Sequence, residues 1–275
     1  MAESKSSWLK GCGIGCGAAI VLILLLSVGG AIVMMKPFRD AVEIRETLVE
    51  RHGDVNEFTP WADGGIPAER LEAFLSVRRA VQENCAAVGA TDDGIAAMDR
   101  LDDKERPDTM EIFGAFGEAS KSVFGMGSVM GEFFRARNAA LLEVDMSLGE
   151  YTYIYALAYG PAIVGPEAGE EEVTGDAHLS SRVRETLRHQ LRNRLAAMGE
   201  VSEGGEDSEE RRLLVEEIAV LEDHPERLPW INVRPPALEA SLARYEEQIA
   251  ELFCADAAHL ELTRNWSLGI GIYGD

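Results

Sequence analysis

A run of 25 residues without a charged side chain, from Gly11 to Met35, constrains this chain more than any other feature. At a rise of about 1.5 Å per residue, roughly 20 apolar residues cross the hydrocarbon core of a bilayer. Trp8 precedes the run, at the place where an interfacial aromatic anchor is expected. A buried helix of a soluble domain seldom reaches this length without a polar face. The sequence therefore predicts a single-pass transmembrane helix at 11–35, with the lipid bilayer as its partner.

A cleaved signal peptide is the main alternative interpretation of this run. Small residues at Ser27, Gly29 and Ala31 fit a cleavage site loosely. Apolar residues continue beyond that point to Met35, which favours an uncleaved signal-anchor. Lys and Arg residues are nearly balanced on the two sides, so charge alone does not decide the orientation. A short tail (1–10) left inside with a long exported domain is the usual outcome, and we therefore expect the soluble domain to be extracytoplasmic.

Four glycines at the start of the apolar run form two overlapping GxxxG spacings, Gly11 with Gly15 and Gly13 with Gly17. This spacing lets two membrane helices approach closely, and it suggests a homo-oligomeric contact within the membrane. The same residues contain a fragment of a dinucleotide-binding pattern. Because no strand precedes the fragment, we expect no nucleotide cofactor there.

Acidic residues dominate the chain, with 48 Asp and Glu against 26 Lys and Arg and a net charge of −22. Binding to nucleic acid depends on a basic face that neutralises phosphates, so we expect no nucleic-acid partner. Apolar residues still make up 46% of the sequence, which is enough for a packed core. The composition is that of an acidic folded domain.

Apolar residues after the membrane segment recur every three or four positions, which predicts helices. We expect a juxtamembrane stalk helix and linker at 36–60, followed by an acidic all-helical domain at 61–275. This domain is predicted to be bundle-like, with about seven helices. The clearest stripes lie at 67–88, 112–133 and 238–252.

Two of the four cysteines fall on predicted helices of the soluble domain. Cys85 lies on an apolar stripe, which indicates a buried small side chain. Cys254 lies off the stripe of its helix, and we expect it to face solvent. These positions argue against a disulfide between them, although the sequence leaves their oxidation state open.

Four of the six tyrosines lie within nine residues, and they are the best candidate for a ligand or partner surface. Ser147 and Glu150 have the spacing of a capping box, which predicts a helix that begins at 148 and stops at Gly160-Pro161. A strand is the alternative, because three of the tyrosines alternate. The plainer interpretation is a core helix whose hydroxyls reach the surface. The candidate surface consists of Glu150, Tyr151, Tyr153, Tyr155 and Tyr159.

Catalytic and metal-binding motifs are absent from the sequence as we interpret it. None of the five histidines has the spacing of a zinc site, and neither a P-loop nor a nucleophile elbow occurs. We therefore expect no metal and no cofactor. The favoured function is a membrane-anchored interaction or scaffold protein with an unknown protein partner. The alternative is a membrane-anchored hydrolase that uses the carboxylates Glu143, Asp145 and Glu150 beside the tyrosines.

Overall fold

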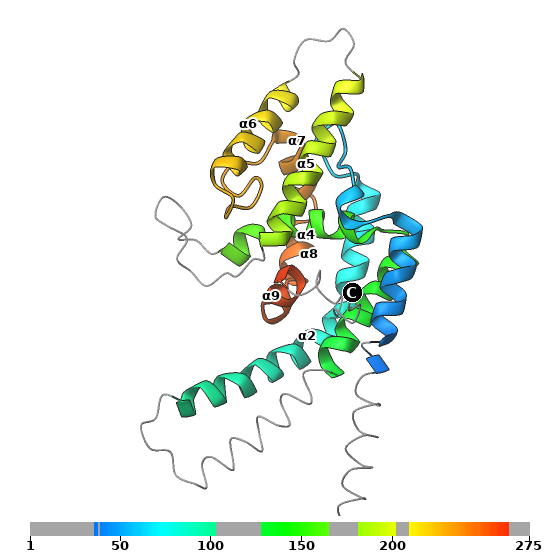
Figure 1. Ribbon diagram of the computed structural model, residues 1–275, viewed down its shortest axis with the longest axis vertical. Helices are drawn as coiled ribbons and strands as arrows, with labels where there is room; N and C mark the ends of the chain where they lie inside the picture. The colour runs from blue at the N-terminus through cyan, green and yellow to red at the C-terminus, as the bar shows by residue number, and fades with distance from the viewer. Residues whose placement is uncertain (1–35, 38, 103–127, 165–180, 202–208, 264–275) are drawn as a thin grey trace, which may run out of the picture.

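The structure is a computed structural model, and its described residues are 36–37, 39–102, 128–164, 181–201 and 209–263 (Figure 1). Within these ranges every regular element is a helix, which confirms the all-α prediction. The elements are the helix at 39–52, η1 (Val55–Glu57), α2 (Ala68–Asp102), the helix at 128–143, α4 (Leu148–Val164), α5 (Ser181–Val201), α6 (Glu209–Asp223), α7 (Pro236–Ala243), α8 (Glu246–Glu251) and α9 (Ala255–Thr263).

None of the helices in these ranges is long and apolar enough to cross a membrane. The predicted membrane segment 11–35 lies outside the described residues. The glycine spacings within it, and most of the stripe at 112–133, are outside them as well. These three predictions are therefore not tested by the structure.

The core is built around α4, which is buried on nearly all sides. Ile154 is fully buried, and its neighbours along the helix are at most 2% exposed. A helix with this burial needs apolar residues all round rather than a single stripe, and α4 supplies them. The stripe predicted for α2 also packs inward, from Leu71 to Val88. Figure 1 shows α5 and α6 side by side over this core, where they contact each other along their lengths.

Residues 39–58 are part of the folded domain rather than a separate stalk and linker. Leu48 and Val55 are at most 4% exposed and belong to the main core, while Ala41 packs into a second cluster with Val81 and Phe133. The short η1 contacts both α4 and α5. The body of the domain therefore begins well before residue 61.

The predicted start of α4 is confirmed, and its predicted end is wrong. The Ser147 hydroxyl accepts a hydrogen bond from the backbone N–H of Glu150 at 2.9 Å, as a helix N-cap does. The strand alternative is thereby wrong. The helix continues through Pro161 to Val164. Proline has no N–H for the carbonyl of Leu157, and the Arg234 guanidinium donates to that carbonyl instead, at 2.9 Å. A distant side chain thus supplies the hydrogen bond that the sequence around Pro161 lacks.

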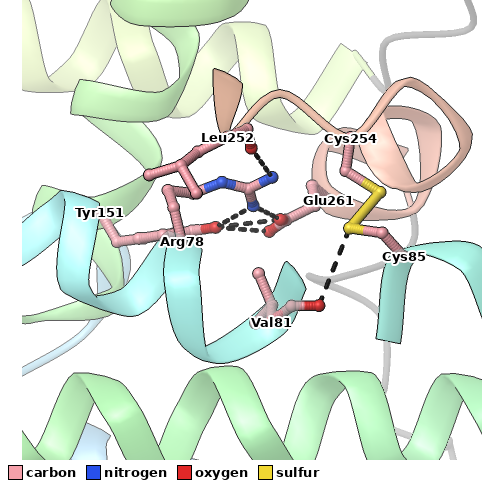
Figure 2. The surroundings of a disulfide bond; sticks show 7 residues. All are labelled: Arg78, Val81, Cys85, Tyr151, Leu252, Cys254 and Glu261. Carbon is pink, nitrogen blue, oxygen red and sulfur yellow. Dashed lines mark hydrogen bonds and ion pairs between the residues drawn. A yellow bond between two sulfur atoms is a disulfide. The ribbon is translucent and has the colours of Figure 1, made fainter. Parts of the chain in front are cut away.

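The helix predicted after Pro236 is broken into α7, α8 and α9, so the expected number of about seven helices is too low. The chain leaves helical geometry at Tyr245, where φ is −121°, and turns again at Leu252. These turns bring Cys254 to Cys85 on α2, and the two form a disulfide with their Cα atoms 5.9 Å apart (Figure 2). Cys254 is only 4% exposed, so the expectation that it faces solvent is wrong. The prediction for Cys254 assumes one continuous helix from Pro236 onward. Because the chain turns at Leu252, the side chain of Cys254 points in a different direction from the one that such a helix would give it.

Candidate functional site

The four clustered tyrosines lie in the core instead of on a surface. Tyr151, Tyr153, Tyr155 and Tyr159 are each at most 2% exposed. The rings of Tyr151, Tyr155 and Tyr159 contact one another along α4 in tilted and edge-to-face pairs, with centroids 5.8 Å apart for the first two and 4.9 Å apart for the last two. Neither the tyrosine surface nor the plainer expectation that their hydroxyls reach solvent agrees with this burial.

A buried ionic centre explains part of the tyrosine cluster. Arg78 on α2 is fully buried, and its guanidinium pairs with Glu261 on α9 (Figure 2). The same guanidinium donates to the Tyr151 hydroxyl at 2.9 Å. That hydroxyl lies 2.9 and 3.0 Å from the two carboxylate oxygens of Glu261, so Tyr151 donates onward to the carboxylate. Arg78 also donates to the carbonyl of Leu252 at 3.2 Å, at the turn before α9.

A second buried arginine joins the centre from the helix at 128–143. Arg137 is 1% exposed, and it lies 3.4 Å from Glu261. It also donates to the side-chain oxygen of Asn138, whose amide in turn donates to the carbonyl of Ala41. Burial lowers the pKa of Arg137, although Glu261 opposes this shift. The centre thus ties together five helices: α2, α4, α9, the helix at 128–143 and, through Asn138, the helix at 39–52.

The protonation of the tyrosines fits a structural role. Burial raises the pKa of Tyr151 and Tyr155 well above the ordinary value, and it raises the pKa of Tyr153 to about 12. These phenols therefore stay neutral at physiological pH, and the Tyr151 hydroxyl donates to Glu261 rather than acting as a base. Arg78 lies over the rings of Tyr155 and Tyr159, 5.1 and 5.4 Å from their centroids. The cluster serves to hold a charge in the core.

The three carboxylates proposed for hydrolysis do not converge on a cleft. Glu150 forms a two-point ion pair with Arg70, at 2.5 and 2.6 Å. Asp145 is exposed, has a positive φ of 53° and pairs with Arg51 at 3.0 Å. Glu143 is exposed to solvent. The hydrolase therefore remains a prediction to which this geometry adds no support.

A groove of about 560 Å³ opens between the C-terminal part of α4, the turn at 229–235 and the helices α7 and α8. Its lining is mostly apolar or aromatic, and several of its side chains are alanines, which leave room between the helices. Glu239, Glu246, Arg234 and Asn232 are the polar side chains at its edge. The apolar and aromatic lining consists of Ala158, Tyr159, Pro161, Ala162, Trp230, Ile231, Leu242, Ala243, Ile249, Ala250 and Phe253.

The turn that forms one wall of the groove is held in place by buried polar contacts. Trp230 has a positive φ of 57°, a conformation that costs energy for a residue with a large side chain. Its backbone N–H donates to the buried carboxylate of Glu217 at 2.7 Å, which compensates for part of that cost. Arg234 is fixed between the Leu157 carbonyl and Glu239, which is 3.6 Å away. The wall is thus a rigid part of the fold.

The groove and the buried arginines were missed at the sequence level. Arg78 lies seven residues after Leu71 and four after Phe74, so its place on the apolar stripe of α2 was a visible signal. No local sequence pattern indicates the groove, because its lining comes from the end of α4 and from segments about 70 positions or more further along the chain. The prolines at 229, 235 and 236 indicated only a rigid connection.

No group of three or more potential metal-binding side chains occurs in the part of the chain that the structure describes. Comparisons with protein-family models, with curated proteins and with solved structures found no match. The function must therefore be argued from the geometry of this chain alone.

Proposed function

We propose that this protein is a membrane-tethered interaction module that holds a partner in the groove between α4, α7 and α8. The observation that carries the proposal is the groove itself, a largely apolar hollow of about 560 Å³ with one wall held by hydrogen bonds to Glu217 and Leu157. Binding sites in proteins are commonly concave and apolar, with a few polar groups at fixed positions. The groove has this composition.

The proposal also includes a membrane anchor and the side of the membrane on which the folded domain lies. The uncharged run 11–35 supports an uncleaved membrane anchor. The buried Cys85–Cys254 disulfide supports an extracytoplasmic domain, because disulfides form and persist mainly in oxidising compartments. The short N-terminal tail would then lie in the cytoplasm.

The ionisable groups of the core support binding rather than catalysis. Arg78, Arg137 and Glu261 are engaged with one another and with backbone carbonyls. Glu150 is held by Arg70. The groove is lined by apolar side chains instead, so its chemistry suits contact with a partner.

Site-specific photo-crosslinking in intact cells of the host tests the proposal. A benzoylphenylalanine residue is placed in the full-length protein at Ala250, which lines the groove and is exposed, or at Glu247, which is exposed on the same helix but does not line it. We expect discrete crosslinked products from position 250 and none of these from position 247. Absence of products at 250, or identical products at both positions, would contradict a partner in the groove.

A further inference from the structure

We infer that the groove binds a cationic amphipathic peptide segment of a partner protein, in which an apolar side chain enters the hollow and flanking Lys or Arg residues meet its acidic edge. This inference rests on the proposed function and specifies the chemistry of the partner. Three features of the groove carry it: its apolar interior, the apolar surface beside it and the charges at its edge.

The interior suits apolar side chains rather than a polar ligand. Leu242 and Ile249 form its α7 and α8 walls, and Pro161 and Ile231 lie opposite. The half-buried Phe253 packs on Tyr159, with ring centroids 5.1 Å apart, and the two rings add aromatic surface to the lining. Burial of an apolar side chain against such a lining is favourable.

The apolar surface continues outside the hollow, which favours a macromolecular occupant. Val233 follows the groove residue Asn232 directly and is 72% exposed. Three of the lining residues, Pro161, Ala162 and Ala250, are themselves exposed, so the apolar surface is continuous from the hollow outward. A small ligand enclosed in the hollow would leave this surface in water, whereas a peptide segment that crosses the rim would cover it.

The charges at the edge of the groove favour a partner segment with a positive charge. Arg234 is compensated by Glu239, at 3.6 Å, and also donates a hydrogen bond to the backbone carbonyl of Leu157. Glu246 then leaves the lining with a surplus negative charge. Complementary charges steer association and exclude partners of like charge. With a net charge of −22, the whole chain repels anionic partners such as acidic lipid headgroups.

Selection from a peptide library tests the inference without a known partner. Random 12-residue peptides displayed on phage are selected on the full-length protein in detergent micelles, after depletion on the variant Ala243→Trp, whose indole would fill the groove. We expect the enriched peptides to carry a net positive charge and to contain apolar residues. The variant Glu246→Lys should weaken their binding about tenfold or more, because it reverses a charge at the edge. The matched control Glu247→Lys, one residue along α8 and outside the lining, should change binding less than about threefold.

The outcomes separate the two proposals. Enriched peptides that are neutral or acidic, or that bind Glu246→Lys as well as the unchanged protein, would overturn the cationic partner and leave the groove as a binding site. No enrichment relative to Ala243→Trp would overturn both. An unchanged far-UV circular dichroism spectrum and an intact disulfide in each variant show that the comparison is made between folded proteins.

Discussion

At the scale of single residues, arginines connect segments by donating to carbonyls that helices leave without a partner. Arg78 donates to Leu252 at the turn before α9, and Arg234 donates to Leu157 where Pro161 interrupts the hydrogen bonds of α4. Arg194 is 1% exposed, donates to the carbonyl of Ala62 and pairs with Glu210. A buried carbonyl without a donor is costly, so each contact both stabilises the fold and fixes the position of a turn.

The variant Glu261→Gln should strongly destabilise the domain. It leaves Arg78 and Arg137 buried without a carboxylate, and breaking a buried ion pair costs about 3–5 kcal/mol. The matched control is Glu222→Gln, which removes an exposed ion pair with Arg192 and should cost less than about 1 kcal/mol. Urea unfolding of the full-length protein in detergent, followed by circular dichroism, measures both. Equal small losses would show that the buried centre contributes little to stability.

Glu217 should make the stability depend on pH. Burial raises its pKa above the ordinary value of 4.5, although the Trp230 N–H and Arg227 oppose the shift. The folded protein then holds the proton more tightly than the unfolded chain, so the free energy of unfolding falls as pH rises between the two pKa values. The variant Glu217→Gln lacks this titration. Its stability relative to the unchanged protein should therefore increase from pH 4 to pH 7, as thermal unfolding at each pH would measure, and a constant difference would contradict the role of Glu217.

At the scale of elements, the helices follow from the sequence better than their ends do. The stripes of α2 and α6 and the start of α4 were predictable, because each depends on residues close together in the chain. The turn at Leu252 and the passage of α4 through Pro161 involve Arg78 and Arg234, which lie far away in sequence. The groove depends on both features, so local patterns could not have predicted it.

The packing of η1 against α4 depends on Gly149. A Cβ atom there would come within 2.4 Å of the carbonyl oxygen of Val55 and 2.8 Å of Cβ of Phe58. The variant Gly149→Ala should therefore lower the free energy of unfolding by about 1–3 kcal/mol. At Gly199 in α5 a Cβ atom would meet nothing within 4 Å, and Gly199→Ala should raise stability by up to about 1 kcal/mol. Thermal unfolding measures the change in stability of each variant, and an unchanged or raised stability of Gly149→Ala would contradict the close contact at Gly149.

At the scale of the whole molecule, the proposed function joins a membrane anchor to a domain on the oxidising side of the membrane. The uncharged run at 11–35 supports the anchor. The disulfide that joins α2 to the start of α9 supports the side of the membrane on which the domain lies. This disulfide spans 169 positions in the sequence, so it restricts the unfolded chain over most of the domain. It also holds α9, and with it Glu261, against Arg78 (Figure 2).

The anchor predicts that the full-length protein stays with membranes in high salt and in alkaline carbonate. A span of about 20 or more apolar residues is held by the hydrophobic effect, which neither treatment removes. Immunoblotting of the pellet and supernatant after centrifugation measures the distribution. Release of the full-length protein by carbonate alone would contradict a spanning anchor.

The state of Cys85 and Cys254 in living cells tests the central claim most directly. Cys12 and Cys16 are first replaced by serine, so that only these two thiols remain. Cells of the host are quenched with acid, the protein is denatured, and a maleimide–polyethylene glycol reagent is added with or without prior reduction. An extracytoplasmic domain predicts no increase in apparent mass without reductant and two additions after reduction. Two additions without reductant would place the domain in a reducing compartment and contradict the account.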